Sequence, residues 1–438
     1  MTDIHAMAKA GRTELDLSLR ECPNCGLFQH LPKIVRGQVA TCPRCEAVLR
    51  RHIADPQSRA LAMALTGLVL FILAAGMPFI DLEVRGRTLR TTLLSGPVQL
   101  EQHGMWEIGL VVLITTLAAP VAKLAAMAWV LIGLRLRHPP RHLYVVFRWV
   151  EKLSPWSMVE VFLLGVFVAY TKLVDLAHVD VGGAVYALGA LMIVMAAADS
   201  VLDREGIWEA LGARGITARS AGAVIAPAQA GRPAARRIGC DTCGLVSWQA
   251  AERSACPRCG DQLHHRKPNS VARTAAFAIT AAILYVPANI QPVLTFTQFG
   301  HGAPSTIVGG VMELAGAGMW PLALLVFFAS VTVPVMKLAG LTWLLLSTRM
   351  AERDRLVERT RLYRIIDVIG RWSMVDVFMI SILTALVRLG AVASVQPGAG
   401  VLSFCAVVIL TILAAMAFDP RLMWDAAGAS DDSADLHA

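Results

Sequence analysis

The chain contains the same long segment twice, and this repeat constrains its fold more than any other feature. Residues 20–210 recur at about 238–426. The clearest matches are the motif C-P-R-C at 42–45 and 256–259, P-V-x-K-L at 120–124 and 334–338, and W-S-M-V-[DE]-V-F at 156–162 and 372–378. A repeat of this length indicates a duplicated domain rather than a solenoid of short units. Polar residues that occupy the same place in both copies are therefore the first candidates for a function.

Each copy is apolar enough to lie in a membrane. The chain is 56% hydrophobic and 16% charged, with a mean hydropathy of +0.57, whereas soluble domains carry about 25% charged residues. A span needs about 20 apolar residues, and long uncharged stretches are rare as core helices of soluble proteins. Eight stretches qualify, four in each copy, near 59–80, 105–134, 157–176, 183–202, 271–295, 317–347, 372–391 and 399–418. The predicted fold class is an all-α polytopic membrane protein with two tandem four-helix transmembrane domains.

The basic residues predict the orientation of the spans. Lys and Arg gather in cytoplasmic loops of membrane proteins. Residues 1–59 carry nine of them and 204–273 carry eleven, while the loops predicted on the opposite side hold only Arg85, Arg87 and Arg90. We therefore expect both termini and the central segment to face the cytoplasm. The formal net charge of +8 is explained by this topology and requires no nucleic-acid partner.

These features divide the chain into six segments. A basic linker rich in Ala and Gly joins the two copies, and an acidic tail at the end of the chain is predicted to be disordered. The expected boundaries are 1–57 for an N-terminal zinc ribbon and its flank, 58–209 for the first transmembrane domain, 210–236 for the linker, 237–268 for a second zinc ribbon, 269–425 for the second transmembrane domain and 426–438 for the tail.

Eight of the nine cysteines predict two metal sites. They form two sets, each made of two C-x-x-C pairs separated by a short arm, which is how a zinc ribbon supplies four thiolates in a tetrahedron. Disulfides or a thiol oxidoreductase are the alternatives, and the expected cytoplasmic location disfavours both because thiols stay reduced there. Nucleic-acid binding by such short, membrane-tethered ribbons is disfavoured too. The expected Zn²⁺ ligands are Cys22, Cys25, Cys42 and Cys45 in one structural site and Cys240, Cys243, Cys256 and Cys259 in the other.

Two lysines are predicted to lie deep in the membrane. Lys123 and Lys337 occupy matching positions in the second span of each copy, three residues after a proline that is expected to bend the helix. Each lies about 16–18 Å from the cytoplasmic end of its span at ~1.5 Å per residue. Glu160 and Asp376, near the start of each third span, are the expected counter-charges. Such pairs either fix helix packing or act as a protonation or gating element, and both interpretations remain open.

The second copy carries more polar groups in its spans. Ser403 and Thr411, about two turns apart in the eighth span, could extend a hydrogen-bonded relay from Lys337. Hydroxyls in helices also bond back to their own backbone, which is the alternative for Thr411. Asp199 in the fourth span is matched by Ala415, so the two copies are not chemically equivalent.

Taken together, the ribbons, P-V-x-K-L and W-S-M-V-[DE]-V-F resemble the paraquat-inducible protein A family over roughly 20–426. The family motif P-A-N is present at 287–289, which makes Asn289 a further candidate, but the first copy has Leu-Ala-Ala at 73–75. The closing D-P-R-L-x-W is intact at 419–424 and degenerate at 203–208. These departures favour the second copy as the active one.

The resemblance implies a function in lipid movement. Members of this family are identified as inner-membrane partners of periplasmic MCE proteins, which form tunnels for lipids in diderm bacteria. The resemblance therefore implies a multi-pass inner-membrane protein that transfers lipids or lipophiles and has no enzymatic activity. The sequence carries no P-loop, G-x-S-x-G or H-E-x-x-H motif. A zinc-ribbon scaffold, an envelope-stress sensor without transport activity and a small-molecule exporter are the alternatives.

Overall fold

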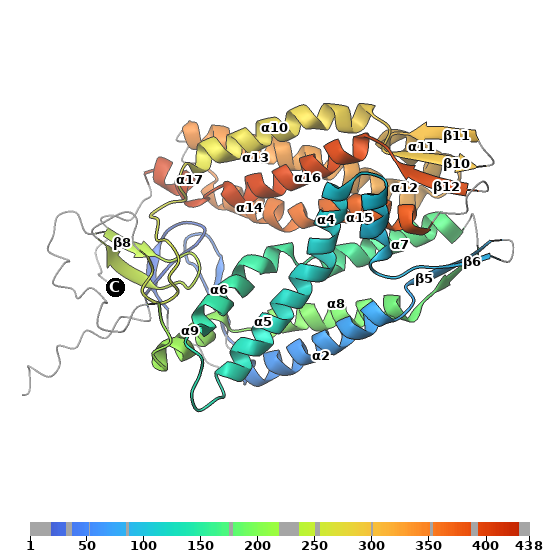
Figure 1. Ribbon diagram of the computed structural model, residues 1–438. Helices are drawn as coiled ribbons and strands as arrows, with labels where there is room; N and C mark the ends of the chain where they lie inside the picture. The colour runs from blue at the N-terminus through green and yellow to red at the C-terminus, as the bar shows by residue number, and fades with distance from the viewer. Residues whose placement is uncertain are drawn as a thin grey trace, which may run out of the picture.

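The computed structural model describes residues 19–31, 37–51, 53–84, 87–174, 178–218, 236–249, 255–298, 301–350, 354–386 and 393–428. Helices make up most of this chain and form one elongated body, with small β-hairpins at one end and two small sheets at the other (Figure 1). The predicted fold class, a duplicated helical membrane protein with a cysteine cluster before each half, is confirmed.

The two halves contain the same elements in the same order. The first half consists of α2 (Pro56–Gly76), α3 (Ser95–Gln102), α4 (Trp106–Leu113), η1 (Ile114–Ala118), α5 (Ala119–Gly133), α6 (Leu143–Leu153), η2 (Ser154–Trp156), α7 (Val159–Val174), α8 (Gly183–Val201) and α9 (Arg204–Ala213). The second consists of α10 (Ser270–Ile290), α11 (Ile307–Gly316), α12 (Trp320–Phe327), η5 (Phe328–Thr332), α13 (Val333–Arg349), α14 (Leu356–Gly370), η6 (Arg371–Met374), α15 (Val375–Leu386), α16 (Gly400–Ala417) and α17 (Arg421–Ala426).

Seven of the eight expected spans are long and apolar enough in the described residues to cross a membrane. They are Pro56–Gly76, Trp106–Gly133, Leu143–Thr171, Gly183–Val201, Ser270–Ile290, Trp320–Arg349 and Gly400–Ala417. The expected span at 372–391 corresponds to α15, whose described part covers Val375–Leu386 and is buried throughout. The rest of that expected span lies outside the described residues.

A widened turn precedes the proline of each second span. In η1, the N–H of Ala119 donates to the carbonyl of Ile114, five residues earlier, and in η5 the N–H of Val333 donates to Phe328 in the same way. Pro120 and Pro334 follow at the next position in each half. A proline has no N–H and crowds the turn before it, and a π-turn accommodates this without ending the helix.

Each half also carries a three-stranded antiparallel sheet that the sequence did not predict. The strands are β5 (Ile80–Val84), β6 (Arg87–Arg90) and β7 (His178–Val181) in the order β6-β5-β7, and β10 (Leu294–Gln298), β11 (His301–Ser305) and β12 (Ala393–Pro397) in the order β11-β10-β12. Each sheet joins the loop after the first span to the loop before the fourth. This connection requires glycine at two positions, Gly182 and Gly398, because a Cβ at either would lie 2.1 Å from a proline carbonyl oxygen.

The cysteines lie on short hairpins at the other end of the body. The first ribbon contains β1 (Leu19–Glu21), β2 (Phe28–His30), β3 (Val39–Thr41) and β4 (Val48–Arg51), and the second contains β8 (Arg236–Gly239), β9 (Val246–Gln249) and an isolated bridge between Ala255 and Gln262. Most of the expected linker, residues 219–235, lies outside the described residues, as does the tail from residue 429.

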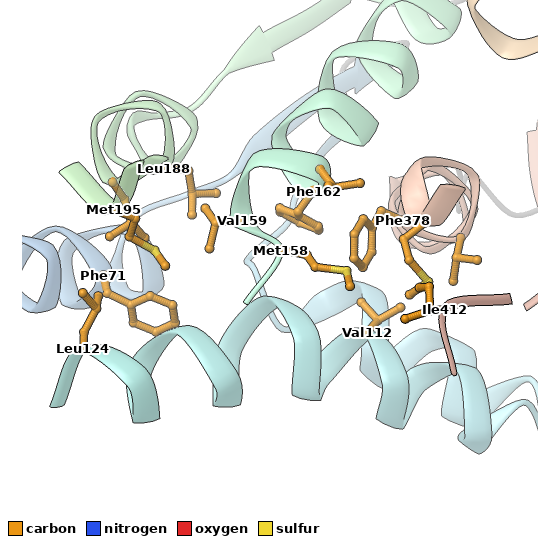
Figure 2. Close-up of a cluster of buried hydrophobic side chains, with 14 of the residues drawn as sticks. Phe71, Val112, Leu124, Met158, Val159, Phe162, Leu188, Met195, Phe378 and Ile412 are labelled. Atoms are coloured by element: carbon orange, nitrogen blue, oxygen red, sulfur yellow. The ribbon is translucent and has the colours of Figure 1, made fainter. Parts of the chain in front are cut away.

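The halves meet through their third spans, α7 and α15, at the centre of the body (Figure 1). Phe162 and Phe378 pack edge to face there with ring centroids 5.6 Å apart, and Met158 and Ile412 lie in the same apolar cluster (Figure 2). Gly165 allows this approach, since a Cβ added to it would lie 3.0 Å from the Cβ of Phe378. The two copies therefore form one continuous core.

Candidate metal centres and intramembrane polar sites

The first ribbon brings four buried sulfur atoms together. The Sγ atoms of Cys22 and Cys45 lie 3.5 Å apart, and those of Cys25 and Cys42 lie 3.6 Å apart. Tight turns aim them inward, with the Cys22 N–H bonded to the Leu27 carbonyl. All four atoms lie within 4.8 Å of one another, and all four residues are free thiols rather than disulfides.

The second ribbon repeats this geometry. The Sγ atoms of Cys240 and Cys259 lie 3.5 Å apart, as do those of Cys243 and Cys256. A tetrahedron with metal–sulfur bonds of ~2.3 Å has sulfur–sulfur edges of about 3.8 Å, close to what both clusters show. The expected grouping of the cysteines is thus found, and each cluster could hold a metal ion through four thiolates. Such a closed set leaves no position for a substrate.

Each ribbon contacts the half of the other copy. The cysteines of the first ribbon share an apolar cluster with Tyr363, Phe418 and Trp424 of the second half, and Arg44 lies over the Trp424 ring at 5.3 Å. Arg364 of α14 donates to the carbonyl of Cys45. The sequence placed this ribbon before the first half, and the structure docks it on the second half as well.

The second ribbon contacts the first half. Arg148 of α6 donates to the Cys259 carbonyl at 3.4 Å, and Lys152 pairs with Asp261 at 3.1 Å. The thiols of this ribbon belong to the same apolar cluster as Trp208 of α9. Because each ribbon contacts the half of the other copy as well as its own, the two ribbons clamp both halves together at this end of the body.

A buried group of charges joins both ribbons to the second half. Arg421 is 3% exposed and pairs with Asp419 at 2.9 Å, Glu21 at 3.1 Å and Asp241 at 3.2 Å. Arg266 pairs with the same Glu21 at 3.2 Å. Burial alone would raise the pKa of Asp419, but the hydrogen bonds and charge of Arg421 outweigh it and hold that pKa below its usual range.

The D-P-R-L-x-W motif therefore has a structural role. Its Asp419 and Arg421 form the centre of the charge group, and its Trp424 packs on the ribbon. In the first half the residue at the place of Arg421 is Glu205, which pairs with Arg20 of the first ribbon at 3.3 Å. The degenerate copy of the motif thus contacts the same ribbon through the opposite charge.

In the membrane, Lys123 pairs with a residue other than the predicted one. Its Nζ lies 2.7 Å from Oδ2 of Asp199 on α8, and the Lys123 side chain is 3% exposed. The predicted pairing with Glu160 is wrong. Glu160 lies 3.9 Å from Arg371 of the second half instead. The fourth span of the same half, rather than the third, supplies the counter-charge.

Lys337 is buried among neutral groups. Its Nζ donates to Thr411 Oγ1 at 2.7 Å, Ser373 Oγ at 3.3 Å and the Gly370 carbonyl at 3.4 Å. The predicted ion pair with Asp376 is not among these described contacts, none of which is with a carboxylate. Asp376 lies three residues after Ser373, buried in the first turn of α15. The described contacts of the Lys337 ammonium group are therefore all with neutral oxygen atoms.

The two lysines have different partners because the polar residue of the fourth span stands one helical turn earlier in the second half than in the first. Thr411 of α16 corresponds to Met195 of α8, and Asp199 of α8 corresponds to Ala415 of α16. Residues four apart lie on the same face of a helix. Each fourth span therefore presents one polar group to its lysine, an acid in the first half and a hydroxyl one turn earlier in the second.

The other polar candidates make different contacts. Thr411 accepts a hydrogen bond from Lys337 and also donates to the carbonyl of Val408 in its own helix at 2.9 Å, so both roles expected for it are found. Ser403 makes no hydrogen bond with another described residue, so the relay is not extended through it. Asn289 bonds back to the Tyr285 carbonyl at 2.8 Å, near the end of α10 away from the ribbons, and does not join the Lys337 group.

A polar crevice lies between the halves beside both lysines. A cavity of about 230 Å³ is lined by Glu151 and Arg204 of the first half and by Asp367, Gly370 and Arg371 of the second. Gly370 is the residue whose carbonyl accepts from Lys337. A smaller cavity of about 30 Å³ includes Arg371 and Asp199, the partner of Lys123. The larger cavity thus includes a partner of Lys337, and the smaller one includes the partner of Lys123.

Sequence reasoning missed three of these residues. Ser373 stands inside the duplicated W-S-M-V motif, so the repeat could have singled it out. Gly370 acts through its carbonyl, which leaves no side-chain signal. Arg371 has no counterpart, because the first half has Pro155 at that place, and a search for duplicated polar residues passes over it.

The chain is similar to known proteins over almost its whole length. The sequence profile of the family described as paraquat-inducible protein A matches residues 57–212 and 271–428. The chain belongs to the paraquat-inducible protein A family. Both matched segments start at a first span and end past a fourth, so the family unit is the four-helix half.

Curated relatives carry transport names. The chain is 34% identical to "Intermembrane transport protein PqiA" of Escherichia coli K12 over 92% of this chain and 95% of the relative. It is 32% identical to "Lipophilic envelope-spanning tunnel protein A" of the same organism over 93% and 91%. It is 23% identical to a "Probable intermembrane transport protein" of Haemophilus influenzae over 95% and 98%. No solved structure matches the chain.

The charge group predicts a large loss of stability when Arg421 is removed. In Arg421→Ala, the buried carboxylates of Asp419 and Glu21 lose their main partner, which we expect to cost about 3–5 kcal/mol. Thermal unfolding of the purified protein, followed by size-exclusion chromatography, measures the loss. Arg361→Ala is the matched control, because Arg361 pairs with Glu46 at 2.6 Å on the exposed surface of the same ribbon contact. Equal melting of both variants would contradict the structural role.

Proposed function

We propose that the chain is the inner-membrane component of an intermembrane lipid transport system and works with a periplasmic MCE tunnel protein. The single observation that carries this proposal is the buried Lys337, held by neutral oxygens in a span and reached from a polar crevice through Gly370. An ammonium group at such a site is costly and typical of transport proteins. The transport names of the relatives support the same conclusion.

The proposed working site is in the second half. Lys123 is neutralised by a carboxylate, whereas Lys337 is not, so protonation of Lys337 changes the net charge inside the second half. The loss or gain of that charge would change the contact between α13 and α16, which Thr411 bridges. We propose that this change opens and closes the path for a lipid. Asp376, Ser403 and Asn289 are kept as candidates near that path, and Lys123 with Glu160 as structural groups.

Substitution of Lys337 separates the two halves functionally. We expect Lys337→Met to abolish transport-dependent resistance of the envelope to detergent while the protein stays in the membrane, because the titratable group is lost and methionine fills a similar space. The matched control is the double variant Lys123→Met with Asp199→Leu, which removes both members of an ion pair. It should keep resistance near the wild-type level. Full resistance in Lys337→Met at normal abundance would contradict the proposal.

The proposed orientation places both termini and both ribbons in the cytoplasm and the two three-stranded sheets in the periplasm. The excess of Lys and Arg on the ribbon side supports it. The sheets would then face the MCE protein. The proposed segments are those expected from the sequence, with the first transmembrane domain extended to Ala213, where α9 ends.

Impermeant labelling tests this orientation. In a Cys405→Ala background, a cysteine at position 302 should react with a membrane-impermeant maleimide added to intact spheroplasts, and one at position 140 should react only after lysis. Position 302 lies near the start of β11 in the second sheet, and position 140 lies between α5 and α6 on the ribbon side. Labelling of position 140 in intact spheroplasts would reverse the proposed topology.

The proposed metal is Zn²⁺ in both ribbons, with a structural role. Four thiolates at tetrahedral spacing and no open position fit a structural zinc site. We expect two zinc ions per purified chain by elemental analysis, and Cys256→Ser should lower both the zinc content and the folded yield because the metal contributes to folding. A folded, reduced protein that contains no zinc would exclude this assignment.

A scaffold or stress sensor without transport activity is the second candidate. The crossed docking of the ribbons favours it, because a change in one ribbon would reach the opposite half directly. The two candidates differ in their response to Lys337→Met, which a scaffold should tolerate.

A further inference from the structure

The second half contains an open apolar groove on its outer face. The groove has a volume of about 260 Å³ and lies between α10 and α13. Figure 1 shows α10 along the outer edge of the helical body, opposite α2 of the first half. Ten residues line it, namely Val271, Ala275, Ala278, Ile279, Ala282, Leu338, Thr342, Leu345, Leu346 and Arg349. Nine of them carry no charge, and the tenth, Arg349, is the last residue of α13.

The first half serves as an internal control, because side chains fill the equivalent space between its helices α2 and α5. Ala275 and Ala282 correspond to Leu61 and Leu68 of α2, and those two leucines pack in the apolar core of the first half. Leu124 of α5 lies so close that a Cβ on Gly67 would be 3.0 Å from it. Two leucine-to-alanine differences thus leave space in the second half that side chains fill in the first.

The extent of burial agrees with this difference. In the first half, 33% of the apolar window in α2 and 50% of that in Trp106–Gly133 are buried. In the second half the values are 22% for α10 and 28% for Trp320–Arg349. The apolar surface that the second half leaves uncovered therefore faces the hydrocarbon of the membrane.

The arginine at the end of the groove is present in both halves, but only the one in the first half has a hydrogen-bond partner among the described residues. The counterpart of Arg349 in the first half, Arg135, lies two residues after the end of α5, donates to Ser58 of α2 at 2.8 Å and joins the helix ends. The residue at the place of Ser58 in α10 is Ala272. Arg349 is exposed and has no hydrogen-bond or ion-pair partner in the part of the chain that the structure describes. Its guanidinium group is available to an anionic ligand at the membrane interface.

We propose that this groove binds one acyl chain of a phospholipid from the inner leaflet, with the lipid phosphate on Arg349. From Val271 to Ala282 the groove extends about 16 Å at ~1.5 Å per residue, which matches the roughly 15 Å of one leaflet of a ~30 Å hydrocarbon core. The alanines accept the chain, and a guanidinium group at the leaflet surface attracts anionic headgroups. The site goes beyond the proposed transport function and exists whether or not its lipid is cargo.

Native mass spectrometry of the full chain tests this proposal. The protein is reconstituted in nanodiscs of equal parts phosphatidylglycerol and phosphatidylethanolamine, released, and scored for retained lipid. In the double variant Ala275→Leu with Ala282→Leu, which installs the residues of the first half, we expect the most tightly held lipid to fall about tenfold, as expected for the loss of roughly two buried methylene groups. The matched control, Ala272→Leu with Ala276→Leu, alters the same helix at positions that do not line the groove and should retain the lipid.

Arg349→Gln tests recognition of the lipid headgroup, and its result does not depend on whether the double variant folds. It should retain a lipid but lose about fivefold of the preference for phosphatidylglycerol over phosphatidylethanolamine, which is what one interfacial charge contributes. Retention equal to wild type in the double variant, or an unchanged preference in Arg349→Gln, would overturn the proposal. Because the readout is bound lipid, it does not depend on transport, and a loss of transport with normal lipid retention would count against the proposed function alone.

Discussion

The arrangement of each half depends on a lysine buried between its second and fourth spans. A charged group in hydrocarbon is stable only beside compensating polar groups. Lys123 therefore requires Asp199 of α8, and Lys337 requires Thr411 of α16 together with Ser373 and the Gly370 carbonyl. These contacts hold the second and fourth spans at a defined distance. In the second half, the contacts with Gly370 and Ser373 also hold the start of the third span beside the crevice between the halves.

The same scaffold carries different chemistry in its two copies. The ion pair of the first half becomes a set of neutral hydrogen bonds in the second, because the polar residue of the fourth span moves by one turn. Glu205 and Arg421 contact the first ribbon with opposite charges. Leu61 and Leu68 fill a space that Ala275 and Ala282 leave open. At the lysines and at the groove, the first half has the neutralised or closed version, which agrees with a supporting role for that half and a working role for the second.

Local features of the fold could be predicted from the sequence, and contacts between distant segments could not. The duplication, the spans and the two cysteine sets are encoded in patterns of a few to twenty residues. The counter-charge of Lys123 was predicted wrongly because Glu160, like Asp376, was chosen for being duplicated. The residues that bond the lysines, Asp199 and Thr411, differ between the copies. Hydropathy also gave no signal for the three-stranded sheets, whose pairs join β5 to β7 and β10 to β12 across whole spans. The crossed ribbons depend on similarly remote contacts.

Lipid transfer from a membrane to a periplasmic acceptor tests the central claim most directly. Vesicles that contain the purified chain and a fluorescent phospholipid are mixed with an MCE-domain protein, and lipid on that acceptor is measured over time. The account predicts that the acceptor is loaded only from vesicles that contain the chain, and that Lys337→Met stops the loading while the double variant of Lys123 and Asp199 does not. Equal loading from vesicles without the chain would contradict it.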